Sequence, residues 1–358
     1  MLTKEKVLKL AGMIQDPILH KSVQVKEVKI KENYVGLKVG LSKTGTPQQL
    51  EIQQKLVDLL KEAGAESVGL RFEQLTLEEL TPDEAKKVNP GVPPLLSPNS
   101  KTAFISIASG KGGVGKSTVS SNLAVALSRL GKKVGLIDAD IYGFSIPNMM
   151  GIERRPEIVN DKIIPPERFG VKVMSMAFFS EDNSPVLWRG PMLGKMLNSF
   201  FTEVNWGELD YLLLDLPPGT GDIALDVHSK LPTSKEIIVT TPHPTAAHVA
   251  VRAGKMALKT NHEILGVIEN MSYFQSEETG KPEYVFGRGG GETLKNELAT
   301  DLFGQLPLAQ PDENSADSSR SIYGADHPVG KVYESIASRV AAKVEMEQFA
   351  DAVLEGMK

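Results

Sequence analysis

The clearest chemistry in this 358-residue chain lies in nine consecutive residues, Gly110–Thr118, which follow a short apolar run and fit the pattern G-x-x-x-x-G-K-[ST]. Closely spaced glycines let the main chain turn tightly and point successive amide N–H groups at phosphate oxygens. Lys116 adds a positive charge, and the Ser117 hydroxyl is a ligand of the kind that Mg²⁺ prefers. The segment therefore predicts a cradle for a nucleoside triphosphate with magnesium. Its members are Gly110, Lys111, Gly112, Gly113, Val114, Gly115, Lys116, Ser117 and Thr118.

The same glycines also fit a second pattern. Read as G-x-G-x-x-G, the segment 110–115 is similar to a dinucleotide loop, and Asp138 ends the next apolar run about where such a site requires an acid. Two features decide against that interpretation. Lys116 and Ser117 have no function at a pyrophosphate bridge but are required beside a triphosphate with magnesium, and Asp215 supplies a second strand-end carboxylate. The sequence therefore favours an ATPase or a GTPase.

Two carboxylates follow the apolar run Val134–Asp138. Asp138 and Asp140 are two residues apart, and alternation along a strand puts both on one side of the strand end, beside the glycine loop. Both are therefore candidate members of the same site.

The run Tyr211–Asp215 ends in a third carboxylate and continues as Leu-Pro-Pro-Gly-Thr-Gly-Asp. A carboxylate at the end of a buried strand is placed to hold the water shell of magnesium. Gly219 and Gly221 can swing toward a γ-phosphate or away from it, which would turn hydrolysis into motion. We therefore expect a nucleotide-controlled switch in this loop.

The nucleobase is expected near Asn270, which follows the apolar run Leu265–Glu269. A side-chain amide offers a donor and an acceptor together to the edge of adenine. The guanine signature N-K-x-D is absent from the sequence, which favours ATP over GTP.

The elements that must position these residues change along the chain. Residues 1–80 have the pattern of a small α+β domain, and residues 81–101 have the composition of a proline-rich linker. Residues 102–358 alternate short apolar strands with helices, which predicts an α/β fold with a mostly parallel sheet covered by helices. The predicted strands of this part are Ala103–Ser109, Lys133–Asp138, Val171–Met176, Tyr211–Leu216, Ile237–Thr241 and Leu265–Glu269.

Composition narrows the classes of function. Hydrophobic residues make up 41% and charged residues 24%, and the net charge of −5 creates no global positive field for nucleic acid or acidic membrane. The chain has no cysteine, which excludes disulfides, thiolate metal sites and a cysteine nucleophile. No stretch approaches the ~18 apolar residues of a spanning helix. We expect a cytoplasmic protein without a membrane partner.

Several segments together resemble the Mrp/ApbC family of iron–sulfur cluster carrier ATPases, a branch of the ParA/MinD superfamily whose deviant P-loop carries two lysines. The leading domain resembles the small domain often fused to that family, so the resemblance covers nearly the whole chain. It implies a homodimeric ATPase that acts in iron–sulfur cluster assembly on client proteins. The segments that carry it are Gly110–Thr118, Trp188–Met192, Asp215–Asp222, Ile268–Met271 and Tyr284–Gly291.

The resemblance also implies roles for single residues. Lys111 would cross the dimer interface to the phosphates of the partner, and Asp140 would orient the attacking water. Asp138 would lie near magnesium, and Asn270 would contact the adenine with Pro307 nearby. The expected catalytic residues are Lys111, Lys116 and Asp140. The expected magnesium-binding residues are Ser117, Asp138 and Asp215.

One departure from the family pattern concerns the cargo. The family usually carries C-P-x-C-G shortly after E-N-M, and two such cysteine pairs in a dimer hold an iron–sulfur cluster. Here Ser276 and Thr279 stand at the cysteine positions. Hydroxyls are poor iron ligands compared with thiolates, so this chain cannot hold a cluster in the family's way.

A second class of function, DNA binding, is therefore an alternative to cluster assembly. Relatives in the ParA branch bind DNA as ATP dimers, and a dimer pools lysines and arginines from both chains into one patch. An ATP-dependent, DNA-binding transcriptional regulator is the alternative. Membrane partitioning, as in MinD, would require a basic tail helix, and the last helix alternates acids and bases.

Overall fold

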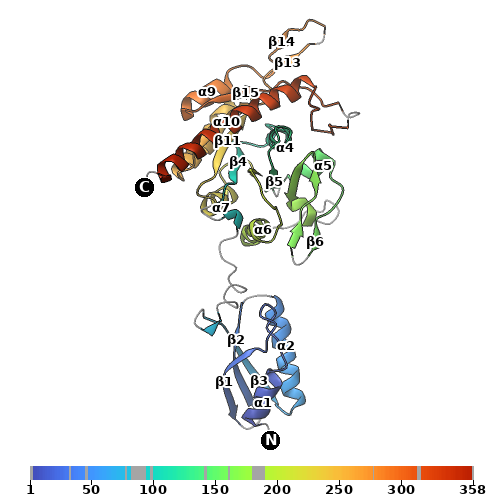
Figure 1. Ribbon diagram of the computed structural model, residues 1–358, viewed down its shortest axis with the longest axis vertical. Coiled ribbons are helices and arrows are strands. Elements are labelled where there is room, and N and C mark those ends of the chain that lie inside the picture. Colours follow the sequence, from blue (N-terminus) through green and yellow to red (C-terminus); the bar gives the residue numbers. More distant parts are fainter. Residues whose placement is uncertain are drawn as a thin grey trace. The chain divides into compact units, whose positions relative to one another are not determined.

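The computed structural model describes residues 3–31, 34–44, 47–76, 79–81, 94–96, 100–140, 143–159, 162–179, 190–276, 278–312 and 316–356. The chain divides into two compact units, Met1–Pro93 and Pro94–Lys358 (Figure 1). The division falls inside the predicted linker, residues 81–101, most of which lies outside the described residues, as does Trp188. The domain limits drawn from the sequence stay a prediction.

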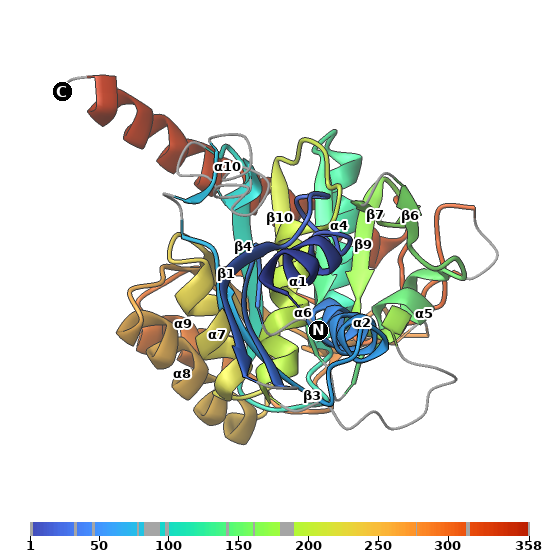
Figure 2. The same cartoon turned by 90° about the horizontal axis from the view of Figure 1, so that it is seen from below.

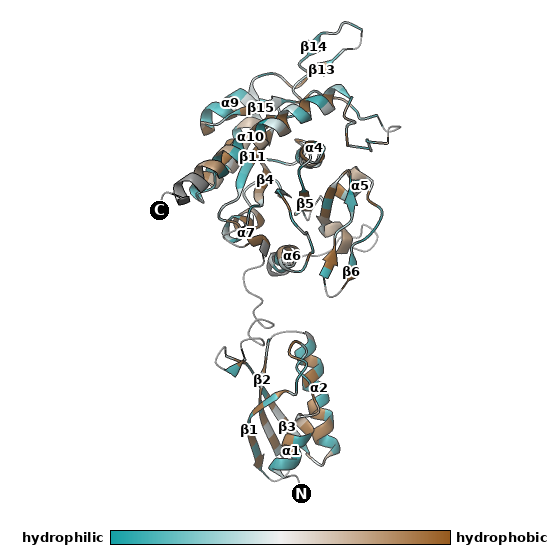
Figure 3. Cartoon of the chain, in the orientation of Figure 1, coloured by the Kyte–Doolittle hydropathy of each residue, from teal (hydrophilic) through white to brown (hydrophobic). Residues whose placement is uncertain are grey.

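In its described residues, the first unit combines a three-stranded sheet with two α-helices. Its strands are β1 (Gln24–Lys31), β2 (Tyr34–Leu41) and β3 (Ser67–Gln74), and its helices are α1 (Lys4–Ala11) and α2 (Pro47–Glu62). The sheet order is β1-β2-β3, with β1 antiparallel and β3 parallel to β2. A parallel pair needs a crossover connection, which α2 supplies. Hydrophilic and hydrophobic residues alternate along α2 (Figure 3), whose apolar side packs on the buried side chains of β2.

The second unit contains an eight-stranded sheet of order β15-β12-β11-β4-β10-β5-β9-β8. All neighbouring strands in it are parallel except β8, which is antiparallel to β9. The carboxyl ends of the parallel strands therefore meet at one edge, where ligands bind in open α/β sheets. The strands are β4 (Ala103–Ser109), β5 (Val134–Asp138), β8 (Glu167–Arg168), β9 (Val171–Ser175), β10 (Tyr211–Asp215), β11 (Lys235–Thr240), β12 (Ile264–Glu269) and β15 (Leu302–Gln305).

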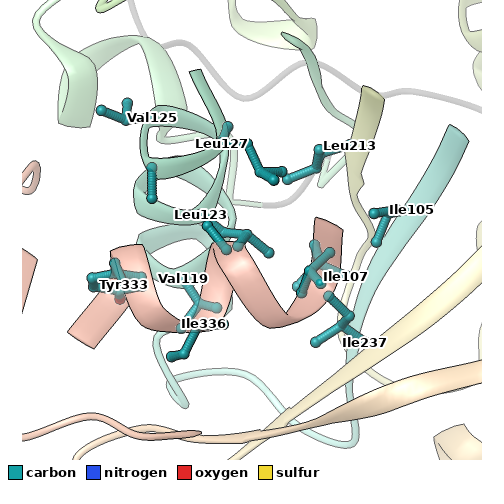
Figure 4. Packing of buried hydrophobic residues seen from close by; sticks show 14 of the residues in the cluster. Ile105, Ile107, Val119, Leu123, Val125, Leu127, Leu213, Ile237, Tyr333 and Ile336 are labelled. Carbon is teal, nitrogen blue, oxygen red and sulfur yellow. The ribbon is translucent and has the colours of Figure 1, made fainter. Parts of the chain in front are cut away.

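Helices cover both faces of this sheet, as the sequence predicted. One buried cluster joins the sheet to α4 (Lys116–Arg129), α5 (Ile146–Met150) and α10 (Pro328–Gly356), and Figure 4 shows its centre. The second cluster joins the other face to α6 (Gly190–Thr202), α7 (Asp222–Lys230), α8 (Pro244–Lys259) and α9 (Gly290–Leu298). In Figure 2, α8 and α9 lie side by side. Along β10, Leu213 belongs to the first cluster and Leu212 and Leu214 to the second, which explains why the strand is apolar throughout.

Some short elements were not predicted from the sequence, because their local signals are weak. The N-cap of α7 is Gly221, which has no side chain to cap the helix, and β15 has only four residues. The described residues of this unit also form two small hairpins, β6–β7 and β13–β14, and two 3₁₀ helices. Their bounds are β6 (Glu157–Val159), β7 (Lys162–Ile164), β13 (Phe274–Gln275), β14 (Pro282–Glu283), η2 (Pro94–Leu96) and η3 (Met176–Phe179). None of the helices in the described ranges has both the length and the apolar character needed to span a bilayer.

Candidate nucleotide-binding site

The glycine loop connects β4 to α4 at the carboxyl edge of the large sheet. Gly113 and Gly115 each have a φ of +80°, which side chains rarely adopt. Gly115 is also the N-cap of α4, so the loop leads its last amides into the positive end of the helix. Gly110 is needed for another reason, since a Cβ there would lie 2.3 Å from the main-chain nitrogen of Ala250 in α8. The fold therefore requires these glycines independently of any phosphate.

Lys116 begins α4 and is only 6% exposed. Its ammonium lies 2.8 Å from Oδ1 of Asp215, the fully buried residue that ends β10. The hydroxyl of Ser117 donates to Asp215 Oδ2 at 2.6 Å, and that of Ser120 donates to Asp215 Oδ1 at 2.6 Å. A single strand-end carboxylate therefore organises the first two turns of α4.

The Lys116 ammonium has donor capacity left for a ligand. It is an ion-pair partner of Asp215, yet within the described ranges it forms no hydrogen bond of good geometry. Asp140 Oδ2 lies 3.9 Å from the same ammonium. A buried ammonium with unused N–H donors fits a phosphate group, because such groups are otherwise costly to bury.

Asp138 lies beside Asp215, since the two residues are in register on the parallel strands β5 and β10. Both are fully buried, and burial followed by the charge of Asp215 raises the pKa of Asp138 to about 7. The Ser175 hydroxyl donates to Asp138 Oδ2 at 2.9 Å, and the N–H groups of Ser145 and Ile146 donate to the same oxygen at 3.2 and 3.3 Å. Two adjacent buried acids repel each other unless a cation joins them.

The oxygens of Ser117, Asp138 and Asp215 therefore fit a magnesium ion. All three are hard oxygen ligands, and the Ser117–Asp215 hydrogen bond together with the strand register brings them to one place. Mg²⁺ usually keeps several waters and phosphate oxygens, so a small protein contribution suffices.

The predicted catalytic residues Lys111 and Asp140 differ in their exposure. The Asp140 side chain is 13% exposed and lies near Lys116. Lys111 is exposed and lines a depression of about 390 Å³ together with Gly113, Thr241 and Phe286, among others. The structure thus groups Asp140 with the buried site, whereas Lys111 faces solvent.

Asn270 and Pro307 line one pocket of about 340 Å³, together with Thr118. The Asn270 Nδ2 donates to the carbonyl oxygen of Val114 at 3.0 Å, which ties this pocket to the glycine loop. A pocket of this size whose wall combines apolar side chains with hydrogen-bonding groups suits a nucleobase. The other residues of its wall include Leu306, Leu308, Arg320, Tyr323 and Tyr333.

The predicted switch residue Gly219 has a φ of +88°, and its N–H donates to the carbonyl oxygen of Ser109 at 2.8 Å. A Cβ at this position would meet nothing within 4 Å, so the glycine is required by conformation rather than by space. The loop after β10 therefore rests against the end of β4, directly before the glycine loop.

Two serines of the site were missed from the sequence. Ser120 follows Lys116 by four residues and therefore lies on the same face of α4. Ser175 ends β9 and is in register with Asp138. The helical spacing could have indicated Ser120, but Ser175 needed the strand order, which puts β9 beside β5.

The parallel sheet, the glycine loop before α4 and the strand-end carboxylates define the class of P-loop NTPases. The family model described as "ParA: NUBPL iron-transfer P-loop NTPase" matches residues 100–341. The chain belongs to this family, which confirms the resemblance seen in the sequence.

Individual relatives agree with that assignment. The chain is 57% identical over 357 residues to the iron–sulfur cluster carrier protein of Bacillus subtilis, covering 97% of this chain and 100% of the relative. It is 40% identical to the protein of the same name from Mycobacterium leprae, over 95% of this chain and 93% of the relative. Among solved structures, a nucleotide-binding protein from Archaeoglobus fulgidus in complex with ADP is 34% identical with a TM-score of 0.50, over 66% of this chain and 87% of that one.

Proposed function

We propose that this chain binds and hydrolyses ATP with magnesium, as a dimeric switch that serves iron–sulfur cluster assembly or transfer. The observation that carries the proposal is the convergence of the Lys116–Asp215 pair, Asp138 and a base-sized pocket at one sheet edge. The ADP in the Archaeoglobus structure supports an adenine nucleotide, and the names of the Bacillus and Mycobacterium relatives support the cluster pathway. A cytoplasmic location stays a prediction.

Hydrolysis would proceed by in-line attack of water on the γ-phosphate, with the bond to the β-phosphate breaking to leave ADP and phosphate. Asp140, beside Lys116, would orient that water. Lys116 would neutralise the charge that grows on the phosphoryl oxygens. Magnesium, held by Ser117, Asp138 and Asp215, would supply further positive charge.

Homodimerisation is proposed because Lys111 faces solvent instead of its own buried site. An exposed lysine of the glycine loop is available to the phosphates of a second copy. Closure of two copies over nucleotide would then add a cation at each site, and the Gly219 loop would report whether a γ-phosphate is present.

An iron–sulfur cluster does not fit the side chains of this chain. In the hairpin, the Ser276 hydroxyl oxygen accepts the N–H of Thr279, and that of Thr279 accepts the N–H of Lys281, both at 3.3 Å. The two hydroxyls therefore serve a turn, and the sequence has no cysteine. We propose that the cluster is held by client proteins while this chain supplies the ATP-driven change of conformation.

Two measurements test the proposal. Phosphate release from magnesium–ATP should be observed for the purified chain, and its absence would defeat the ATPase. Anaerobic reconstitution with iron and sulfide should leave the isolated chain without a cluster. One cluster per dimer would overturn the proposal that client proteins, and not this chain, hold the cluster. The alternative of a DNA-binding regulator has no support from the comparisons, and it would be favoured by ATP-dependent, salt-sensitive retention of DNA.

A further inference from the structure

The hairpin of β13 and β14 projects from the rest of the second unit, in the segment between Ser272 and the start of α9 (Figure 1). The segment after the hairpin, residues 284–289, carries exposed side chains, among them Val285 and Phe286. It ends at Gly289, the N-cap of α9, which has a φ of +84°. Both ends of this excursion return to the same small region beside the nucleotide pocket.

Glu269, the last residue of β12, anchors both ends. It is 1% exposed, and its Oε2 accepts the N–H of Gly291 in the first turn of α9 at 2.5 Å. Its Oε1 accepts the Ser272 hydroxyl at 2.7 Å and the Gln305 amide at 2.8 Å. A Cβ at Gly291 would lie 2.9 Å from Glu269 Cβ, so the glycine permits this approach.

The first end of the excursion is also bonded to the wall of the base pocket. The N–H of Ser272 donates to the carbonyl oxygen of Leu306 at 2.8 Å, and the N–H of Leu308 donates to that of Tyr273 at 2.7 Å. Leu306 and Leu308 both line the pocket, with Pro307 between them. Glu269 joins this wall as well, because its carbonyl oxygen accepts the N–H of Leu306 at 2.8 Å.

We propose that Glu269 is a positioning residue that couples occupation of the base pocket to the β13–β14 hairpin and the first turn of α9. The inference rests on the proposed function, because the occupant is an adenine nucleotide. A base that moves the pocket wall or Asn270 would shift Glu269, and its carboxylate would carry that shift to both ends of the excursion. The negative charge of the carboxylate also suits the N-terminus of α9.

The chemistry of the carboxylate makes an isosteric test available. Glu269 accepts from donors on both oxygens. Glu269→Gln leaves one oxygen for the fixed N–H of Gly291 and puts an NH₂ group against Gln305, whose amide must turn over to accept from it. Adding Gln305→Glu places a carboxylate acceptor opposite that NH₂ group. The Ser272 hydroxyl can then donate to the main-chain oxygen of residue 269, which lies 3.0 Å away and is unaffected by either substitution.

The experiment is hydrogen exchange of the hairpin and of the first turn of α9, with and without ADP and magnesium. In the unaltered chain, ADP should change the exchange rates by at least about fivefold. Tripolyphosphate with magnesium occupies the cradle without a base and should leave them unchanged. Glu269→Gln should bind ADP but lose the response, and the Glu269→Gln/Gln305→Glu pair should regain it.

Glu292→Gln is the matched control, since Glu292 lies in the same turn of α9 with its side chain in solvent, and it should respond like the unaltered chain. Should Glu269→Gln fail to fold, Ser272→Ala removes one donor and should weaken the response. An unchanged response in Glu269→Gln, an equal response to tripolyphosphate, or no response despite bound ADP would each overturn the coupling. A chain that binds no ADP by calorimetry would instead refute the proposed function, and this inference with it.

Discussion

The glycine loop and the β13–β14 hairpin lie in one unit but are held in opposite ways. Between β4 and α4 the loop is packed against α8 and Asn270, so that a Cβ at Gly115 would lie 2.2 Å from the Asn270 amide nitrogen. In the hairpin turn Gly280 also has a positive φ, +64°, but a Cβ there would meet nothing within 4 Å. The first region is constrained by its surroundings, and the second only by its own backbone.

This difference explains how one chain can keep the family's phosphate cradle and lack the cysteines of its cargo motif. A side chain at Gly110 would strike the main chain of α8 and one at Gly115 would strike Asn270, so these two positions of the cradle have little freedom. Ser276 and Thr279 contact only their own turn in the hydrogen bonds described. Cysteines can be replaced there without cost to the fold, while the nucleotide site persists.

The largest expected effect is on turnover in the cradle. Lys116→Ala removes the buried ammonium, and kcat for phosphate release should fall by at least about 100-fold. The fold should persist, because Asp215 keeps its hydroxyl donors Ser117 and Ser120, and circular dichroism checks this. Normal turnover in a folded variant would contradict the assignment.

A matched pair of glycine substitutions tests whether the glycine loop is more tightly constrained by its neighbours than the hairpin turn. Gly115→Ala meets both an unfavourable φ and the Asn270 side chain, so it should cost about 1–3 kcal/mol of unfolding free energy and weaken ADP binding. Gly280→Ala meets only the unfavourable φ and should cost about 1 kcal/mol while leaving ADP affinity unchanged. Denaturant unfolding and calorimetry are the measurements, and equal losses in both variants would refute the proposed difference.

Lys111→Ala separates binding from hydrolysis. Because Lys111 faces solvent and is assigned to the partner's phosphates, kcat should fall by about 10–100-fold while Kd for ADP changes less than about threefold. Lys281→Ala, an exposed lysine of the hairpin, serves as the control and should change neither value. Equal losses of affinity and turnover in Lys111→Ala would argue against a role across a dimer.

The smallest effect on stability is expected in the hairpin. The double change Ser276→Cys and Thr279→Cys should alter the free energy of unfolding by no more than about 0.5 kcal/mol, because both side chains bond only within the turn. After anaerobic reconstitution, the double variant should acquire the visible absorption of an iron–sulfur cluster, since thiolates are suitable iron ligands. A variant that folds normally yet takes up no cluster would show that more than the two side chains has diverged.

Much of the fold followed from sequence patterns. The apolar strands, the glycine loop and the helix behind it predicted the mostly parallel sheet that the structure shows, because buried strands and helices have distinct periodicity. Strand order and short elements could not be predicted, since β15, with four residues, carries little local signal. The roles assigned to Lys111, Asp140 and Asn270 stay predictions, although the structure puts Asn270 and Pro307 in one pocket.

The sequence by itself determined the residue types that can bind a triphosphate, the class of fold that presents them, and the lack of any thiolate for a cluster. These properties depend on local spacing and on composition. Only the tertiary structure decided that Asp138 stands beside Asp215, that Ser175 supports it, and that Glu269 joins the pocket wall to the start of α9. Such contacts link residues from separate strands and helices, and their proximity arises when the sheet assembles in one particular order.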